Sequence, residues 1–382
     1  MKMSFCLQHF LFAGTILAAS AVLPPAAAVH AQAMEPEDLS YNPCADQAPR
    51  SPESGRYRVG WAVGGSADGY GVILRTKDGG VTWTRQGQAG EIPDFDALGV
   101  SAVDALNAWV VGDNVILRTQ NGGLTWKQEQ LPDHLPQDFT LFQVKALDRW
   151  TAFAVGSQSV LLQTRWSADS KSGYAWSRMR TAPNMPPIHF NDVDASDANH
   201  VWTVGSLQSG DNARSGLAIA FFNGILWKPQ LITNANSSGL CSAFIGVSAV
   251  NTRTVWAVGG LSCPPYVTGD GGKTWNPNGN ALALGLDTNR VVAVTRKLIW
   301  ATTDDGIFRS EDGGASWELT GTCGGYCYGV SAAGTRYAWA SDLGYAPPGD
   351  LYRWDACSGQ WESQTVPAVS SIVTISFAGA RR

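Results

Sequence analysis

Two pairs of neighbouring aspartates are the residues in this sequence best suited to acid and base chemistry. Asp94 or Asp96 can combine with Asp304 or Asp305 as the paired carboxylates of a glycoside hydrolase do, although the sequence leaves their separation open. The histidines form no H-x-x-x-H or H-E-x-x-H pattern, and neither a P-loop nor a G-x-S-x-G motif occurs. We therefore expect no metal ion and no cofactor.

Other aspartates belong to a repeated segment with the pattern S/T-x-D-G-G-x-T/S-W. It occurs nearly unchanged four times, and its acceptor and tryptophan positions are Asp78 and Trp83, Asn121 and Trp126, Asp270 and Trp275, and Asp312 and Trp317. The aspartate can accept hydrogen bonds from turn amides, the glycine pair permits positive φ, and the tryptophan can pack between sheets. Asn121 keeps the acceptor and loses the charge. We interpret these residues as structural turn caps rather than as catalytic acids or calcium ligands.

Seven such units divide the chain. Weaker versions of the segment end at Trp176, Trp227 and Trp361, and the seven terminal tryptophans are 43, 50, 51, 48, 42 and 44 residues apart. A second motif, W-x-V-G or a weaker form of it, lies upstream in every unit, and the two positions together account for 13 of the 16 tryptophans. Short apolar runs bounded by Gly, Asn and Asp indicate strands. The repeat has the length of one blade, so the sequence predicts an all-β fold, a seven-bladed β-propeller of four-stranded antiparallel blades.

The two ends of the repeat array predict how the ring closes. The first unit begins at residue 57 with its second strand, whereas residues 372–377 form an apolar run that belongs to no unit. We expect this C-terminal run to become the innermost strand of the first blade, which removes the free sheet edges. The expected organisation is a signal peptide at 1–33, an N-terminal tail at 34–56 and the propeller at 57–382.

The N-terminal segment has the pattern of a secretory signal. Lys2 precedes an apolar run at residues 10–23, and small residues favour cleavage after Ala31 or Ala33. A membrane anchor is the alternative, but Gly, Thr, Ser and a Pro pair interrupt the run before it could span a bilayer. Cleavage removes Lys2 and no acid, so the net charge moves from −5 to −6 in a secreted or periplasmic protein. The acidic balance and the lack of a basic run predict no nucleic-acid partner and no membrane span after cleavage.

The cysteines agree with export. Apart from Cys6 in the signal, six remain, an even number that suits an oxidising compartment and allows 15 full pairings. Closeness in sequence favours disulfides between Cys241 and Cys263 and between Cys323 and Cys327. Cys44 would then pair with Cys357, because these two cysteines remain. A redox or metal pair at the C-x-x-x-C spacing is the alternative, and it lacks partner ligands.

With its recurrent W-x-V-G, I-L-x-T and D-G-G-x-T-W elements, the chain resembles the Asp-box (bacterial neuraminidase repeat) propellers over residues 57–378. It is most similar to the photosystem II stability/assembly factor family, whose Arg-rich patch is not obvious among only 27 basic residues here. The resemblance implies an exported, non-enzymatic protein-binding scaffold, expected to be a monomer. The same repeat also serves sialidases and xyloglucan hydrolases. A carbohydrate-active enzyme, either a glycoside hydrolase or a polysaccharide lyase with a glycan as ligand, is therefore the alternative.

The expected binding site lies on the face opposite the Asp-box turns, where blade-to-blade connections and the loops between second and third strands gather. The candidate rim residues there are Tyr266, Arg214, His189, Asp304, Asp94, Tyr326 and Tyr345, with Asp96, His134, Asp192, Asp305 and Tyr328 as further members. Any one of them taken alone is more often an ordinary solvated loop residue than a ligand contact.

Overall fold

Short antiparallel strands make up the fold in the computed structural model of the chain, and the described residues contain no helix. The structure describes residues 57–65, 71–87, 92–166, 174–208, 214–234, 241–260, 263–278, 287–334, 336–343, 350–367 and 369–380. The predicted signal peptide and N-terminal tail lie outside these residues. All described residues belong to the unit that spans Ala48–Arg382.

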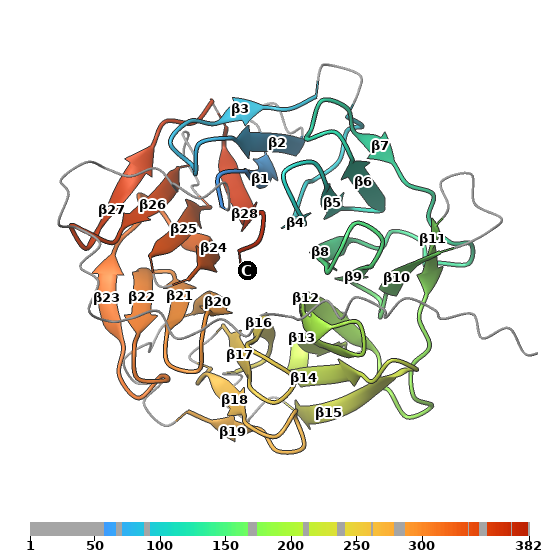
Figure 1. Ribbon diagram of the computed structural model, residues 1–382. Coiled ribbons are helices and arrows are strands. Elements are labelled where there is room, and N and C mark those ends of the chain that lie inside the picture. The colour runs from blue at the N-terminus through green and yellow to red at the C-terminus, as the bar shows by residue number, and fades with distance from the viewer. Residues whose placement is uncertain are drawn as a thin grey trace, which may run out of the picture. The chain divides into compact units, whose positions relative to one another are not determined.

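Seven four-stranded sheets surround a central axis as the blades of a propeller, which confirms the predicted fold class (Figure 1). From the innermost strand outwards, the blades are blade 1, β28 (Ser371–Phe377), β1 (Gly60–Gly65), β2 (Gly71–Thr76) and β3 (Thr84–Arg85); blade 2, β4 (Gly99–Ala102), β5 (Ala108–Gly112), β6 (Val115–Thr119) and β7 (Lys127–Gln128); blade 3, β8 (Leu141–Ala146), β9 (Ala152–Gly156), β10 (Leu161–Trp166) and β11 (Tyr174–Arg178); blade 4, β12 (Ile188–Asp197), β13 (His200–Gln208), β14 (Arg214–Phe222) and β15 (Trp227–Asn234); blade 5, β16 (Phe244–Ala249), β17 (Val255–Gly259), β18 (Tyr266–Thr268) and β19 (Asn276–Pro277); blade 6, β20 (Thr288–Ala293), β21 (Ile299–Thr303), β22 (Gly306–Ser310) and β23 (Glu318–Gly321); and blade 7, β24 (Cys327–Ala333), β25 (Tyr337–Asp342), β26 (Leu351–Asp355) and β27 (Gln360–Gln364).

The alternating strand direction gives the propeller two distinct ends. Hairpins between first and second strands and between third and fourth strands lie at one end, which we call the Asp-box face. Turns between second and third strands lie at the other end together with the blade-to-blade connections, and we call this end the loop face. Every prediction about a site can therefore be assigned to one face.

The ring is closed by the C-terminal strand, as the orphan apolar run predicted. β28 pairs antiparallel with β1 in a register that runs from Gly60 opposite Phe377 to Gly65 opposite Ser371. The backbone amide of Ala378 continues the ladder by donating to the carbonyl of Val59 at 2.9 Å. Blade 1 is thus built from both ends of the array, so the ring cannot open without breaking a sheet.

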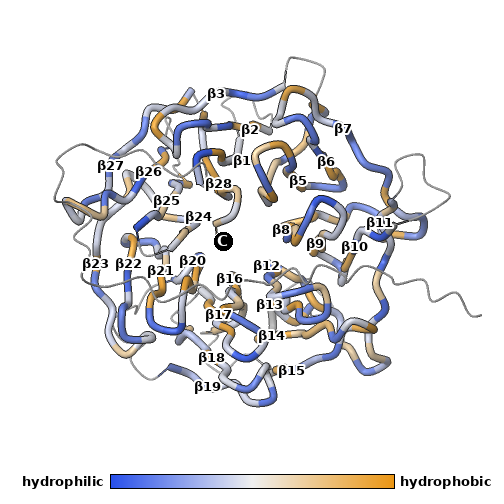
Figure 2. Tube along the Cα trace, viewed as in Figure 1, coloured by the Kyte–Doolittle hydropathy of each residue, from blue (hydrophilic) through white to orange (hydrophobic). Residues whose placement is uncertain are grey.

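The hydrophobic core lies between the blades. Buried apolar residues form seven clusters, each shared by two neighbouring blades, so every blade buries both of its faces. Figure 2 shows the apolar residues along the inner and middle strands, whereas the outermost strands β3, β7 and β19 are polar. This arrangement explains why strands such as β5 read as continuous apolar runs without polar alternation.

The glycine of the W-x-V-G motif is fixed by the close approach of two strands. A Cβ on Gly112 would lie 1.6 Å from the carbonyl oxygen of Asp96, and one on Gly205 would lie 1.8 Å from that of His189. Equivalent glycines in blades 1, 3 and 5 meet a backbone oxygen in the same way. The motif glycine therefore reflects a packing requirement that recurs in blades 1–5.

Side chains of the inner strands tie neighbouring blades together. The Oγ atoms of Ser101 and Ser248 accept hydrogen bonds from the amides of Ala146 and Ala293 in the following blades, each at 3.0 Å. Ser376 of the closing strand does the same for Ala102 at 3.0 Å. The closing strand is therefore bonded both to its own blade and to blade 2.

Two of the predicted disulfides are present: Cys241–Cys263 in blade 5, and Cys323–Cys327 between blades 6 and 7. Cys357 is also disulfide-bonded. Its predicted partner, Cys44, lies outside the described residues.

Candidate functional site

In blade 1, the Asp-box aspartate closes its own turn. Asp78 accepts hydrogen bonds from the amide and hydroxyl of Thr82 at 2.9 and 2.6 Å, and from the hydroxyl of Thr76 at 2.7 Å. The Thr76 hydroxyl in turn accepts the amide of Gly80 at 2.9 Å, and the indole of Trp83 donates to the carbonyl of Gly80 at 3.1 Å. Both carboxylate oxygens are thus occupied by the turn, which leaves this aspartate poorly suited to acid or base catalysis.

The other Asp-boxes repeat this geometry. Side-chain and backbone hydrogen bonds from Ser316 lower the pKa of Asp312 from 3.8 to about 2, and hydrogen bonds from Thr274 lower that of Asp270 further. Asn121 accepts the amide of Thr125 at 3.0 Å in the same position. These carboxylates stay ionised at neutral pH, where an acid catalyst would have to hold a proton.

Arginines of the I-L-R-T segments stack on the tryptophans of the W-x-V-G motif. The guanidinium of Arg118 lies 4.5 Å from the ring centre of Trp109, and Arg75 lies 5.4 Å from that of Trp61. Each arginine also donates to a carbonyl of the next blade, Arg75 to Ala105 at 3.1 Å and Arg118 to Arg149. This role of the arginines was not predicted from the sequence, although their recurrence was a signal. These cations serve the architecture and are not available to a ligand.

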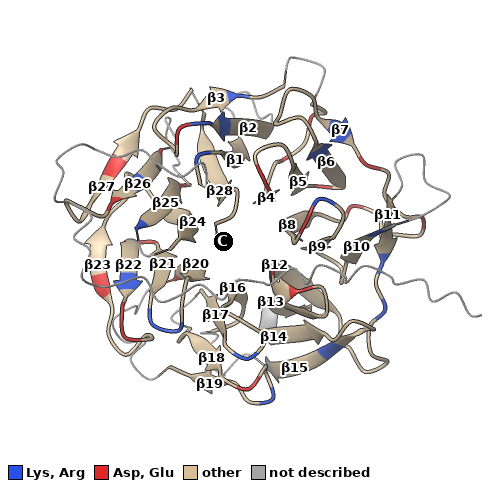
Figure 3. Ribbon diagram, in the orientation of Figure 1, with Lys and Arg blue, Asp and Glu red and all other residues tan. Residues whose placement is uncertain are grey.

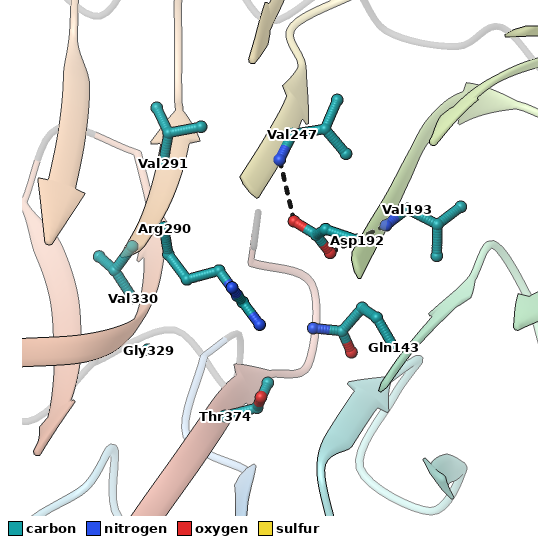
Figure 4. A pocket seen from close by; sticks show the side chains of 9 residues that line it. All are labelled: Gln143, Asp192, Val193, Val247, Arg290, Val291, Gly329, Val330 and Thr374. Atoms are coloured by element: carbon teal, nitrogen blue, oxygen red, sulfur yellow. Dashed lines mark hydrogen bonds between the residues drawn. The ribbon is translucent and has the colours of Figure 1, made fainter. Parts of the chain in front are cut away.

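The axial channel is narrow and lined by polar side chains. Figure 4 shows Arg290, Asp192 and Gln143 pointing into it from three different blades, around a cavity of about 20 Å³. Arg290 donates to the carbonyls of Ile245 and Asn289 at 3.0 and 2.9 Å. A space of this size holds about one water molecule. A glycan or peptide cannot thread this part of the channel.

Asp192 corrects one expectation, because it is not on the loop-face rim. It lies within β12, is 6% exposed, and accepts the amide of Val247 in blade 5 at 2.9 Å. The pairing of β12 with β13 shifts register between Phe190 and Asp192, and such a bulge changes which side chains face inward.

The rim candidates of blades 4 and 5 lie within or at the start of strands. His189 is half-buried in β12, and Arg214 is the first residue of β14. Tyr266 begins β18 and packs edge-on against Phe244, with ring centres 5.3 Å apart. These three residues therefore sit on separate strands of two neighbouring blades, and their role in binding stays a prediction.

The remaining rim candidates are spread around the ring. Asp94 is exposed in the connection between blades 1 and 2, and Tyr326 is 40% exposed in the disulfide-closed loop before blade 7. Asp304, in the turn between β21 and β22, accepts the side-chain amide of Asn289 at 3.0 Å. Tyr345 lies outside the described residues. The candidates thus form no single cluster in the described part of the propeller.

The aspartates considered as an acid and base pair belong to non-adjacent blades. Asp96 precedes blade 2, where burial and then the charges of Asp113 and Asp94 raise its pKa, while Asp304 belongs to blade 6.

Among the residues described, no group of three or more His, Cys, Asp or Glu side chains is placed to hold a metal ion. Figure 3 shows charges of both signs interspersed around the ring rather than gathered in one belt.

A groove on the loop face lies between blades 3 and 4 and is the strongest candidate site. Its volume is about 430 Å³, and it is lined by Ser159, Arg178, Met179, Arg180, Thr181, Met185, Pro186 and Pro187. Two exposed arginines thus flank an otherwise apolar or hydroxyl-bearing wall without an acidic residue. Such a wall suits a segment that combines an apolar side chain with a carboxylate.

The groove is held in place by contacts with the outer edge of blade 4. The carbonyl of Arg180 accepts the amide of Trp227 at 2.9 Å, and the amide of Ala182 donates to the carbonyl of Trp227 at 2.8 Å. The indole of Trp227 donates to the sulfur of Met179 at 3.1 Å. Residues 181–190 were expected on the loop face, but these contacts depend on distant strands and could not be predicted.

The comparisons with known proteins agree with this architecture. Residues 55–178, which hold β1–β11, match the family model described as photosynthesis system II assembly factor YCF48. No curated protein gives a significant match to the sequence. No helix in the described part of the chain is long and apolar enough to cross a membrane.

Several solved structures share the fold. The structure described as YCF48 bound to D1 peptide superposes with a TM-score of 0.54 at 18% identity, covering 74% of this chain and 86% of its own. YCF48 from Cyanidioschyzon merolae gives a TM-score of 0.52 at 16% identity, with 85% and 96% covered. A protein from Lactobacillus plantarum gives 0.55 at 10% identity, with 84% and 99% covered. The motifs, the seven closed blades and the match over residues 55–178 lead to one conclusion: the chain is a BNR-type propeller related to the assembly factor YCF48.

Proposed function

We propose that this chain is an exported, non-enzymatic protein-binding scaffold of the photosystem II assembly/stability factor type. The observation that carries the proposal is the match of residues 55–178 to the YCF48 assembly-factor family. A structural relative of the same name is described as bound to a D1 peptide, which supports a protein segment as the ligand class. The matched residues end at Arg178, in the wall of the groove between blades 3 and 4.

In this proposal the groove is the binding site. Arg178 and Arg180 pair with carboxylates of the bound segment, and Met179 and Met185 pack against its apolar side chains, because methionine adapts to irregular surfaces. Since Arg178 ends β11 and Arg180 lies on the connection anchored to Trp227, the backbone that carries both arginines is held in position before the partner arrives. A preorganised site loses less conformational entropy on binding.

Export is supported by the chemistry of the cysteines. Cys241–Cys263 and Cys323–Cys327 are disulfides, and Cys357 is disulfide-bonded as well. Disulfides persist mainly in oxidising compartments. The proposal therefore locates the mature protein outside the cytoplasm, after removal of residues 1–33.

The test compares two charge reversals in affinity isolation from the envelope of the producing organism. Arg178→Glu combined with Arg180→Glu should reduce recovery of a bound protein about tenfold or more, since the two lost charge pairs are together worth about 1.4 kcal/mol or more. Arg253→Glu combined with Arg296→Glu is the matched control, because these exposed arginines lie on the Asp-box face. Equal recovery with both variants would contradict the proposal. So would turnover of a polysaccharide that is abolished by Asp304→Asn or Asp94→Asn.

A further inference from the structure

Large exposed apolar side chains gather on the Asp-box face. Of the eight that are exposed among the described residues, five occupy hairpin tips of blades 1–4, namely Val81, Leu106, Leu124, Trp150 and Ile225. Isolated exposed apolar residues are ordinary on a protein surface, but several on one face of neighbouring repeats indicate contact with another molecule.

The fold does not require apolar residues at these tips. Asp148 closes the hairpin of blade 3 by accepting the amide of Trp150 at 2.6 Å, and Asn251 closes that of blade 5 by accepting the amide of Arg253 at 2.9 Å. The same tip position thus holds tryptophan in one blade and arginine in another, with the same hydrogen bond. Likewise the Asp-box tip is Leu124 in blade 2, whereas blade 5 has a lysine there.

Trp150 is contacted by three side chains although it is 44% exposed. The guanidinium groups of Arg149 and Arg118 lie 4.9 and 5.6 Å from its ring centre, and the ring of Tyr174 is 6.0 Å away. Trp150 is also one of three tryptophans that neither repeated motif explains. A half-exposed tryptophan packed against neighbouring side chains is typical of the residues that dominate binding energy at protein interfaces.

Leu106, Leu124 and Trp150 form a patch, which we call the tip patch, on blades 2 and 3. The amide of Gly122 donates to the carbonyl of Leu106 at 2.9 Å and so joins the two hairpins of blade 2, while Arg118 of blade 2 donates to the Arg149 carbonyl beside Trp150.

Beside the tip patch, the channel opens into a cavity of about 520 Å³ with Val103, Leu147 and Val250 in its wall. The cavity also contains the ion pair between Lys145 and Asp194, whose Nζ and Oδ1 atoms are 2.6 Å apart. The cavity offers room for a side chain of whatever covers the tip patch.

The charges around the tip patch select the kind of partner. Asp104 and Asp148 accept hydrogen bonds from turn amides through their carboxylates. The guanidinium of the exposed Arg149 stacks on Trp150, and its N–H groups can donate hydrogen bonds to a partner. A partner carboxylate would complete this site. Attraction to an anionic membrane needs a cluster of basic residues, and here aspartates alternate with the arginine.

We propose that the tip patch is a second protein-docking surface, which binds an apolar segment carrying a carboxylate opposite Arg149. It lies on the face opposite the groove of the proposed function and does not depend on that groove. A scaffold with two such faces can hold two proteins together.

The test is a selection of random 12-residue peptides displayed on phage, followed by fluorescence anisotropy of synthetic copies. The immobilised protein carries Arg178→Glu and Arg180→Glu, so that ligands of the groove are not recovered. We expect apolar peptides with an Asp or Glu, whose affinity falls about 30-fold or more with Trp150→Ala and at least several-fold with Leu124→Ala or Arg149→Gln. Leu319→Ala is the matched control, because Leu319 is 51% exposed on the outer strand of blade 6, and it should leave affinity unchanged.

Three results would overturn the proposal. The first is that the selected peptides bind all four variants equally, and the second is that they lack a carboxylate. The third is that vesicles of phosphatidylcholine and phosphatidylglycerol bind the protein in a Trp150-dependent way while no peptide does. Circular dichroism of each variant verifies that a loss of affinity does not reflect unfolding.

Discussion

Phe377 of the closing strand offers the sharpest test of the ring. It is fully buried, stacks on Trp339 with ring centres 3.6 Å apart, and meets Trp83 edge-on at 5.8 Å. Replacing a buried phenylalanine with alanine lowers the free energy of unfolding by about 3–5 kcal/mol. A propeller of about 320 residues has an unfolding entropy of about 0.7 kcal/mol per kelvin, so Phe377→Ala should lower the Tm by about 4–7 °C.

Truncation after Val369 should act more strongly, because it removes the whole of β28. Ile372 and Ile375 are also buried, and their loss together with Phe377 amounts to about 7–15 kcal/mol, as much as the total stability of many proteins. The assay is differential scanning calorimetry of the truncated chain beside Phe377→Ala and the exposed control Leu319→Ala. A truncated protein that melts at the wild-type temperature would refute the closure of the ring by β28.

Three further predictions concern the disulfides, the Asp-box and the motif glycine. Mass spectrometry without reduction should recover the Cys241–Cys263 linkage, and three or more alkylatable cysteines in the exported protein would contradict it. The folded state lowers the pKa of Asp312 from 3.8 to about 2, so its stabilising contribution is present above pH 4 and is lost as the pH falls toward 2. Asp312→Asn should therefore reduce the difference between urea midpoints at pH 7 and pH 3, and an unchanged difference would count against this assignment. Gly112→Ala should lower the free energy of unfolding by about 3 kcal/mol because its Cβ would overlap a backbone oxygen, whereas Gly269→Ala, with no atom within 4 Å, should be neutral in the same urea titration.

The fold could be predicted because it repeats. Each blade carries the same two aromatic positions at nearly constant spacing, and 13 of these 14 positions are tryptophan. The repeat array lacks a strand at its start and has an unused strand at its end, which admits a simple closure. The disulfides Cys241–Cys263 and Cys323–Cys327 could be predicted because each joins cysteines of one local segment.

The positions of the candidate sites depend on contacts between segments that are distant in sequence, and a repeat pattern does not specify such contacts. The groove exists because residues 180–182 bond to Trp227, which is far away in sequence and lies on another blade. Asp192 faces inward after a bulge that recurs at the same place in the first strand of six blades, and neither sequence motif indicates which side chains follow it inward. The stacking of Arg118 on Trp109 could have been predicted from the sequence, because aligning the hairpin of β5 and β6 places these two residues opposite each other.

The central claim, that the chain binds a protein segment in the groove between blades 3 and 4, is tested most directly by a photocrosslinker placed at Met185. This half-buried side chain lines the groove without contributing a charge. Irradiation of cells that produce the protein with p-benzoylphenylalanine at position 185 should give one discrete crosslinked protein, and the adduct should disappear when Arg178 and Arg180 are changed to glutamate. Failure to form an adduct, or an adduct that persists after both charge reversals, would contradict the claim.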